Sequence, residues 1–188
     1  MQTPRKPLKP LDEALQELLV HAQAMAGVQQ VNTFDADGRV LLQAAVSPLQ
    51  VPPQYNSAMD GYAVRAAECA SGDAVLPVSQ RIPAGVSPGA LAAGSIARIF
   101  TGAPVPAGAD AIVMQEDCEV LEDGSVRVKA QPQAGQWIRR AGEDITQGAT
   151  VIEAGTRLTP AHLGLAASMG FASLPVARKP RVALFSTG

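Results

Sequence analysis

Asp60 is the first residue whose type and setting suggest chemistry. It stands immediately before Gly61 and shortly after the proline-rich segment 51–53. A tight turn there could aim its carboxylate at a hard cation or at a ligand hydroxyl. The alternative is an Asx turn, in which the carboxylate accepts hydrogen bonds from its own local backbone.

Thr101 offers a hydroxyl at the end of an apolar run, next to Gly102 and before a proline-stiffened loop. Small residues there would let a phosphate approach the backbone N–H groups. The Thr101 hydroxyl would donate a further hydrogen bond, worth about 1.5–3 kcal/mol to a charged acceptor. The alternative is a stiff connection between two strands.

A third segment, residues 137–144, combines two guanidinium groups with two carboxylates. Arg139 and Arg140 suit bidentate recognition of phosphate, and Glu143 or Asp144 could hold a cation or orient an arginine. A solvated, charged turn explains the same residues equally well.

Charge and composition exclude several other functions. Fifteen Lys and Arg against 17 Asp and Glu give a formal net charge of −2, whereas nucleic-acid binders carry a basic excess. Cys69 and Cys118 lack CxxC spacing and a nearby histidine, which indicates reduced apolar residues rather than a zinc or redox site. His21 and His162 lie far apart with no serine or cysteine motif, which argues against a catalytic histidine.

The apolar content indicates a folded protein outside the membrane. Hydrophobic residues make up 47% and charged residues 17% of 188, enough apolar surface for at least one core. No run reaches the roughly 20 apolar residues needed to span a bilayer. Acidic residues at 12, 13 and 17 exclude a secretory signal, so we expect a cytoplasmic protein with no membrane partner.

The N-terminal part predicts one long helix. Apolar residues at helical spacing, an acidic first turn and Gly27 at the end predict a helix over 11–26. Its apolar stripe requires a partner, which we expect in a distant part of the fold. Val28, Val31 and Phe34 are spaced as a further helical turn, and residues 39–46 predict a strand.

The central part is predicted to be β-rich. The 17 glycines and 15 prolines have no period and favour many turns over a helix bundle. Asp123-Gly124 lies between two partly alternating segments, 119–122 and 125–129, which predicts a hairpin. Other short apolar runs indicate strands at 61–64, 75–78, 96–100 and 111–114.

The C-terminal part predicts a strand, a helix and two further extended segments. Residues 151–152 indicate a strand, and Thr159-Pro160 should cap a helix that reaches Met169, with Gly170 past its end. Residues 171–176 are predicted to be extended. The apolar run 182–185 is typical of the first parallel strand of a further α/β domain, with an edge strand of the β unit as the alternative.

Six segments of the chain resemble, in order, those of the molybdopterin molybdenumtransferase family, the molybdenum insertases related to the gephyrin E domain. They are Val51-Pro52-Pro53, 56–65 (NSAMDGYAVR), 101–106 (TGAPVP), 113–116 (VMQE), 139–145 (RRAGEDI) and 182–188 (VALFSTG).

The resemblance implies an enzyme of molybdenum cofactor biosynthesis. It would take molybdate and adenylylated molybdopterin as substrates and, with Mg²⁺, release AMP and molybdenum cofactor. It also implies a homodimer, a small-molecule pterin substrate and contact with the molybdopterin adenylyltransferase. The cleft would lie between the β domain of one subunit and an α/β domain of the other. Such chemistry requires charge neutralisation and hydrogen-bond donors more than a covalent nucleophile.

By position in the motifs, the resemblance assigns Asp60, Thr101 and Asp144 to catalysis. Its expected cofactor-binding residues are Ser57, Met59, Gly102, Arg139, Arg140, Ser186, Thr187 and Gly188. No metal ligand is assigned.

Two departures qualify the resemblance. Gln54-Tyr55 stands where the family usually has Phe-Asp, and segment 29–37 matches poorly. The family also continues beyond Ser-Thr-Gly into an α/β domain and a small β domain, so we expect this chain alone to be an inert fragment. The competing interpretations are a non-catalytic scaffold or binding module of the same family and a free-standing β domain for another phosphorylated ligand.

The resulting expectation is a mixed α and β fold of several subdomains. A β-rich domain (47–146) would be inserted in an elongated α+β linker and dimerisation subdomain (27–46 and 147–177). The N-terminal helix (1–26) would pack on the α/β domain that the resemblance implies, and residues 178–188 would be the first strand of that domain.

Overall fold

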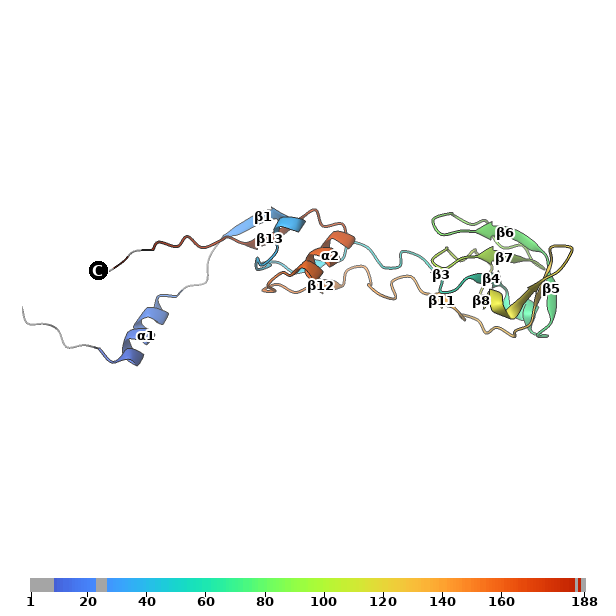
Figure 1. The fold of residues 1–188 in the computed structure, drawn as a ribbon, viewed down its shortest axis with the longest axis horizontal. Coiled ribbons are helices and arrows are strands. Elements are labelled where there is room, and N and C mark those ends of the chain that lie inside the picture. Colours follow the sequence, from blue (N-terminus) through green and yellow to red (C-terminus); the bar gives the residue numbers. More distant parts are fainter. Residues whose placement is uncertain (1–8, 23–26, 185, 187–188) are drawn as a thin grey trace, which may run out of the picture. The chain divides into compact units, whose positions relative to one another are not determined.

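The computed structural model describes residues 9–22, 27–184 and 186. The chain divides into two compact units, one of Met1–Ala45 with Ile152–Gly188 and one of Val46–Val151 (Figure 1). We call the second the β unit and describe each unit by itself. No helix within the described ranges is long and apolar enough to cross a bilayer.

The first unit begins with α1 (Leu11–Val20), which is shorter than predicted. His21 caps its C-terminus, and residues 23–26 lie outside the described ranges. None of its residues is buried. Its apolar stripe is exposed, at Leu11, Leu15, Leu18 and Leu19.

The predicted helical turn after residue 27 is wrong. Residues Val28–Asn32 form strand β1, which pairs antiparallel with β13 (Ser173–Ala177) from Val28 opposite Ala177 to Asn32 opposite Ser173. Only Thr33–Asp35 (η1) forms a short 3-10 turn. The pairing explains the difference, because a partner strand about 140 residues away stabilises an extended backbone that local spacing does not favour.

The predicted strand over 39–46 is interrupted. Val40 and Leu41 make isolated bridges to Arg157 and Val176. Only β2 (Ala45–Val46) forms a strand, and it pairs with β12 (Thr150–Ile152). The core of this unit comes from apolar side chains of α2, β13 and the connecting segments, including Leu41, Leu158, Leu163, Leu174 and Val176.

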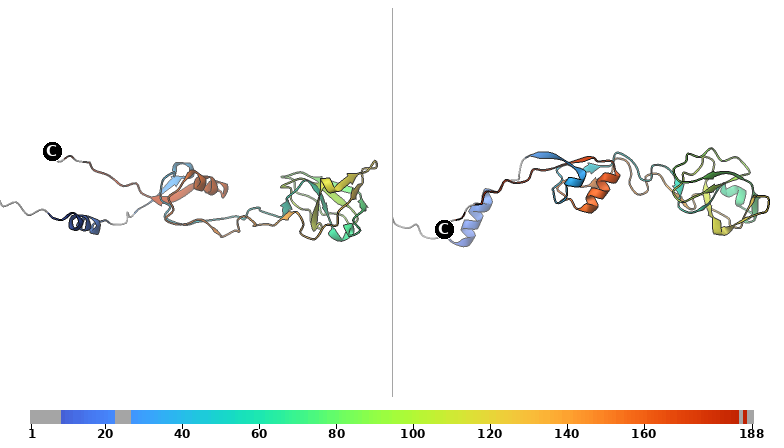
Figure 2. Two further views of the ribbon diagram at one scale, coloured as in Figure 1. Left: turned by 60° about the horizontal axis from the view of Figure 1, so that its bottom comes forward. Right: turned by 45° about the horizontal axis from the view of Figure 1, so that its top comes forward.

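Helix α2 (Pro160–Ser168) confirms the prediction for this segment. Thr159 is its N-cap, Pro160 its first residue, and Gly170 beyond its end has a φ of +85°. The His162 ring accepts a hydrogen bond from the Thr159 amide at 3.1 Å, so this histidine caps the helix. The helix contacts η1 in the same unit (Figures 1 and 2).

The apolar run after residue 181 does not form the predicted strand in its described part. Residues 182–184 have no regular secondary structure and are exposed, and Phe185 lies outside the described ranges. They also make no bridge to the β unit within the described part of the chain. A parallel strand forms only beside a neighbour that supplies its hydrogen bonds.

The β unit is built on a four-stranded sheet in the order β6-β7-β4-β8. A three-stranded sheet, β5-β10-β9, and the short pair β11-β3 complete it (Figure 1). The strands are β3 (Asn56–Ser57), β4 (Gly61–Val64), β5 (Ala74–Leu76), β6 (Val78–Ile82), β7 (Ile96–Ile99), β8 (Ala111–Met114), β9 (Cys118–Val120), β10 (Val126–Val128) and β11 (Ile138–Arg139). Two 3-10 turns, η2 (Ala66–Cys69) and η3 (Gln115–Asp117), follow β4 and β8.

Strand β4 is buried along its whole length because both faces of the sheet are covered. Tyr62 and Val64 belong to one core cluster, which includes β10 side chains, whereas Ala63 belongs to another. This alternation is what a pleated strand produces. The hairpin prediction is confirmed, since β9 and β10 pair across the Asp123-Gly124 turn.

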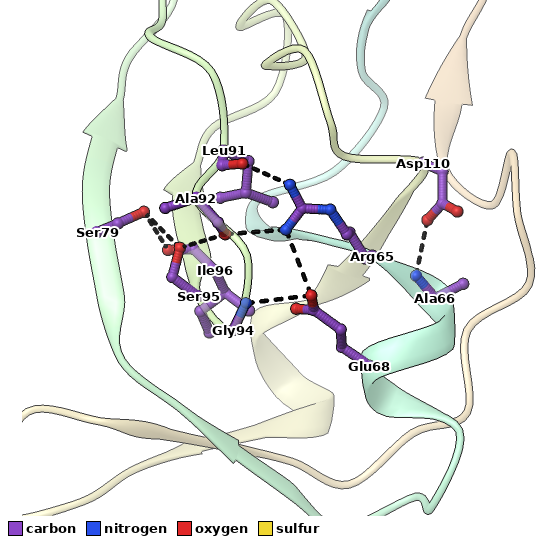
Figure 3. Close-up of polar contacts among 10 residues, drawn as sticks. All are labelled: Arg65, Ala66, Glu68, Ser79, Leu91, Ala92, Gly94, Ser95, Ile96 and Asp110. Atoms are coloured by element: carbon purple, nitrogen blue, oxygen red, sulfur yellow. Dashed lines mark hydrogen bonds and ion pairs between the residues drawn. The ribbon is translucent and has the colours of Figure 1, made fainter.

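Arg65 and Glu68 fix the segment that leads into β7 (Figure 3). The Arg65 guanidinium donates to the carbonyls of Leu91 and Ala92, at 2.5 and 2.9 Å, and Glu68 accepts from the Gly94 amide at 3.1 Å. In the same view, the Asp110 carboxylate accepts from the Ala66 amide at 2.7 Å. These bonds hold the segment before β7 and the residue before β8 on the segment that follows β4.

Candidate functional site

Asp60 and Thr101 lie together at neighbouring ends of β4 and β7. Oδ1 of Asp60 accepts hydrogen bonds from both the amide and the hydroxyl of Thr101, each at 2.8 Å. The Asx-turn alternative for Asp60 is therefore wrong, because its carboxylate bonds a residue 41 positions away. Both side chains are exposed, so the pair is open to a ligand.

The environment keeps Asp60 ionised. The hydrogen bond from the Thr101 amide lowers the pKa of Asp60 most, followed by the bond from the Thr101 hydroxyl. The positive charge of Arg98 acts in the same direction, while partial desolvation opposes it. At neutral pH this carboxylate is an acceptor only.

Arg98 positions the backbone beside this pair, and the sequence analysis missed it. Its guanidinium donates to the Gly61 carbonyl at 2.8 Å and to Gln115 Oε1 at 2.6 Å. It also lies over the rings of Phe100 and Tyr62, 4.5 and 5.3 Å from their centroids. The available signal was Phe100, two residues beyond Arg98, whereas the contact with Tyr62 depends on the pairing of β4 with β7.

The loop after Thr101 does not present free amides to a phosphate, as the sequence had suggested. The Thr101 amide bonds Asp60, the Gly102 amide donates to the Ser57 carbonyl at 2.8 Å, and the Ala103 amide donates to the Phe100 carbonyl at 2.9 Å. The chain itself satisfies these donors because the loop closes on the turn after β3.

Ser57 and Met59 shape that turn. Ser57 is fully buried, and its hydroxyl donates to the Met59 carbonyl at 2.5 Å. The Ser57 side chain therefore stabilises the turn that carries Asp60, and its expected binding role stays a prediction. Met59 is half-buried.

Arg139 and Asp144 form a second polar pair. Backbone hydrogen bonds through β3 connect it to the Asp60–Thr101 pair. Arg139 lies opposite Asn56 in the β3–β11 pairing. Its Nη2 atom is 2.6 Å from both Asp144 oxygens, and Glu143 accepts from its Nε at 3.5 Å. The hydrogen bond and charge of Asp144 raise the pKa of Arg139 above its usual range. The expectation that an acidic residue orients an arginine here is confirmed.

Two other polar groups beside this pairing remain without partners among the described residues. The Asn56 Oδ1 atom is buried and accepts no hydrogen bond there. The Arg140 side chain is exposed and makes no hydrogen bond or ion pair with any residue of the described ranges, although its amide donates to Glu143 at 2.8 Å. Of the two, the exposed Arg140 side chain is available to a ligand.

The remaining predicted positions belong to the other unit. Ser186 is exposed and without regular structure, in the other unit, and Thr187 and Gly188 lie outside the described residues. Within the described part of the chain, no group of three His, Cys, Asp or Glu side chains could hold a metal ion. Asp60 alone does not make a magnesium site.

The fold is similar to that of solved structures described as MoeA proteins of molybdopterin biosynthesis. Two crystal structures of the Pyrococcus horikoshii protein match 93% of this chain at TM-scores of 0.80 and 0.81, with 31% and 32% sequence identity. The chain covers 45% and 47% of those structures.

The chain belongs to the MoeA family, because its residues 9–170 match the model for the MoeA N-terminal region, domains I and II. Among curated relatives, molybdopterin molybdenumtransferase of Synechococcus elongatus is 41% identical over 173 residues, which is 89% of this chain and 43% of the relative. Molybdopterin molybdenumtransferase 2 of Mycobacterium tuberculosis is 47% identical over 158 residues, or 81% of this chain and 39% of the relative. The chain thus spans less than half the length of these relatives. The resemblance identified from the sequence motifs is confirmed.

Proposed function

We propose that this chain is the N-terminal part of a molybdopterin molybdenumtransferase that acts in molybdenum cofactor biosynthesis. The observation that carries the proposal is the Asp60–Thr101 pair, an ionised, exposed carboxylate within the region that matches the MoeA family model. Relatives named molybdopterin molybdenumtransferase support a role in molybdenum cofactor biosynthesis, and the resemblance of the sequence motifs implies the reaction. Molybdenum bonds to the two thiol sulfurs of adenylylated molybdopterin, and one molybdate oxygen leaves as water with the two thiol protons. A water added across the phosphoanhydride bond then releases AMP and leaves the other phosphate on the molybdenum cofactor.

The polar groups of the β unit have distinct roles in this proposal. The Asp60 carboxylate, fixed by Thr101, accepts a hydrogen bond from a donor group of the substrate. Arg139, held by Asp144, presents its other guanidinium hydrogens to a substrate phosphate. The anhydride carries negative charge on both phosphates, so an oriented cation lowers the barrier to its cleavage.

The resemblance adds Mg²⁺ to this reaction. Because the described residues provide no cluster of metal ligands, no step here depends on a metal held by this chain. Molybdate enters as a substrate and requires no resident site.

The longer enzyme is proposed to be a cytoplasmic homodimer that receives its pterin substrate from the molybdopterin adenylyltransferase. Its cleft would lie between the β unit of one subunit and an α/β domain of the other, with residues 47–146 as the inserted domain and 27–46 and 147–177 as the linker. The α1 stripe, exposed at Leu11 and Leu18, would pack on that further domain. The 188-residue chain alone is then expected to be inactive.

The test compares two carboxylates of the β unit in the longer protein. Asp60→Asn should reduce AMP release and molybdenum insertion by at least roughly a hundredfold, the loss typical of one positioned electrostatic group. Asp123→Asn is the matched control, because Asp123 accepts from the amide and hydroxyl of Ser125 at an exposed hairpin turn. Equal insertion activity of both variants would contradict the role of Asp60, whereas no insertion by the unaltered longer protein would contradict the enzyme assignment and favour a scaffold.

A further inference from the structure

A cavity of about 320 Å³ lies in the β unit beside the β3–β11 pair. Val105, Ala109 and Ile138 form part of its wall and also pack on the core cluster around Ile99 and Ile112. The wall is therefore an extension of a rigid core. The volume is near the lower end of the range for small-molecule sites, and suits one ring system rather than a large ligand.

The strand register separates this cavity from the Arg139–Asp144 pair. Ile138 lies opposite Ser57, and Arg139 lies opposite Asn56. Side chains alternate between the faces of a strand, so Arg140, one residue beyond β11, returns to the face of Ile138. Tyr55, one residue before β3, extends to the same face, and both Tyr55 and Arg140 line the cavity.

The segments around the cavity are held by main-chain hydrogen bonds. The Val105 amide donates to the Tyr55 carbonyl at 3.1 Å, and the Gly135 amide donates to the Asp110 carbonyl at 2.7 Å. Pro106, also in the wall, is buried. The cavity is therefore formed before any ligand arrives, which reduces the entropy cost of binding.

Only two side chains give this mostly apolar cavity polar character. The Arg140 guanidinium and the Tyr55 hydroxyl make no hydrogen bond with any residue in the described ranges. A guanidinium at the edge of an apolar wall matches a flat ring that carries an anionic group, since the ring fills the apolar space and the anion pairs with the cation. Tyr55, 56% exposed, offers an aromatic face to the same ring.

We propose that this cavity is a binding subsite for a planar heteroaromatic ring bearing an anionic group, with Arg140 as the anion partner and Tyr55 as the ring partner. The proposal rests on the proposed function and deepens it. The proposed substrate carries two such groups, the adenylyl end and the pterin end. Tyr55 stands where the family motif usually has an aspartate, so this chain would bind the ring through an aromatic contact that an aspartate does not provide.

The test is calorimetric titration of the 188-residue chain with AMP and, separately, with pterin-6-carboxylate. At least one should bind, and its addition should shift the amide resonances of Gly135 and Ile138. Binding of AMP alone would assign the adenylyl end, and binding of the pterin alone would assign the pterin end. Either result supports the subsite.

Two variants localise the binding, and one serves as control. Arg140→Gln should weaken binding about tenfold or more through loss of the charged hydrogen bonds. Ala107→Leu, at an exposed wall residue, should weaken it similarly by filling the cavity. Arg157→Gln removes the same charge from an exposed residue of the other unit and should leave binding unchanged. Circular dichroism checks that each variant is folded.

The subsite is overturned if neither ligand binds at millimolar concentration, if the shifts lie away from the cavity, or if Arg140→Gln binds as tightly as the unaltered chain. These outcomes are distinguishable from failure of the proposed function. If the longer protein inserts molybdenum but neither ligand binds this chain, only the subsite is overturned. If a ligand binds this chain but the longer protein inserts no molybdenum, only the proposed function is overturned.

Discussion

One oxygen of Asp60 accepts two hydrogen bonds from Thr101, from its amide and from its hydroxyl, both at 2.8 Å. The bonds join the start of β4 to the end of β7 and lower the pKa of the carboxyl group. These bonds fix the orientation of the Asp60 carboxylate and favour its ionised form, although Thr101 lies 41 positions further along the chain.

The Asp60 titration should respond to the Thr101 hydroxyl. Thr101→Val removes one of the two bonds and keeps the amide, so the pKa of Asp60 should rise part of the way toward its ordinary value of 3.8. Carboxyl ¹³C resonances followed against pH measure this change. Asp123 is an internal reference, since its pKa is lowered by Ser125 instead. An unchanged Asp60 titration would contradict the geometry.

The same shift defines a pH dependence of stability. The folded-state pKa of Asp60 lies below the unfolded value, so its ionised form stabilises the fold above the unfolded pKa. That contribution is lost as the pH falls through the folded pKa. Urea unfolding of Asp60→Asn and the unaltered chain should therefore differ more at pH 7 than at acidic pH. A difference independent of pH would refute this linkage.

Gly61 should not tolerate a side chain. A Cβ atom there would lie 1.9 Å from the Val113 carbonyl oxygen, so Gly61→Ala must displace β8 from β4. We expect a loss of about 3 kcal/mol of unfolding free energy, at the upper end for overpacking. Gly102→Ala is the control, because its φ is +79° with open space around it and the cost should be roughly 1 kcal/mol. Denaturant unfolding gives both values, and equal losses would be inconsistent with a close approach at Gly61.

Arg98 should contribute more to stability than its neighbour Arg81. Arg98 contacts two rings and donates to Gly61 and Gln115, whereas Arg81 lies over the Phe100 ring, 4.7 Å from its centroid. Arg98→Gln should lower the unfolding free energy by about 1–2 kcal/mol and Arg81→Gln by about 0.5 kcal/mol. The reverse order would show that Arg98 does not hold the strand ends together.

The two cysteines should react slowly with alkylating reagents. Burial raises the pKa of Cys69, and it raises the pKa of Cys118 to about 12, with nearby Asp117 adding to the latter shift. Thiols rather than thiolates are then present at pH 8, so iodoacetamide should react roughly a hundredfold or more slowly than with the unfolded chain. Mass spectrometry of timed samples measures this rate, and fast labelling of the folded chain would contradict the burial.

Short sequence motifs correctly predicted the elements that depend on neighbouring residues. Thr159, Pro160 and Gly170 mark helix α2, and Asp123-Gly124 marks the β9–β10 hairpin, because caps and tight turns depend on adjacent residues. The strand β1 was mistaken for a helical turn because its partner β13 is remote in sequence. Helix α1 ended early because its apolar stripe has no packing partner among the described residues to extend it.

The candidate site shows the same difference between contacts made locally and contacts made through strand pairing. The Arg139–Asp144 contact spans five residues and was anticipated as an arginine oriented by a nearby carboxylate. Asp60 and Thr101 were each singled out, but their bond depends on strands β4 and β7 lying side by side. The burial of Ser57 was not predicted, since it follows from the closure of the Thr101 loop over this residue. Long-range pairing thus decides which polar residues face a ligand.

The most direct test of the account is a count of products with adenylylated molybdopterin and molybdate as substrates. The longer protein should release one AMP for each molybdenum inserted, and the 188-residue chain should release none. Product formation by the 188-residue chain would contradict this result. So would a longer protein that inserts no molybdenum, or that inserts molybdenum without releasing AMP.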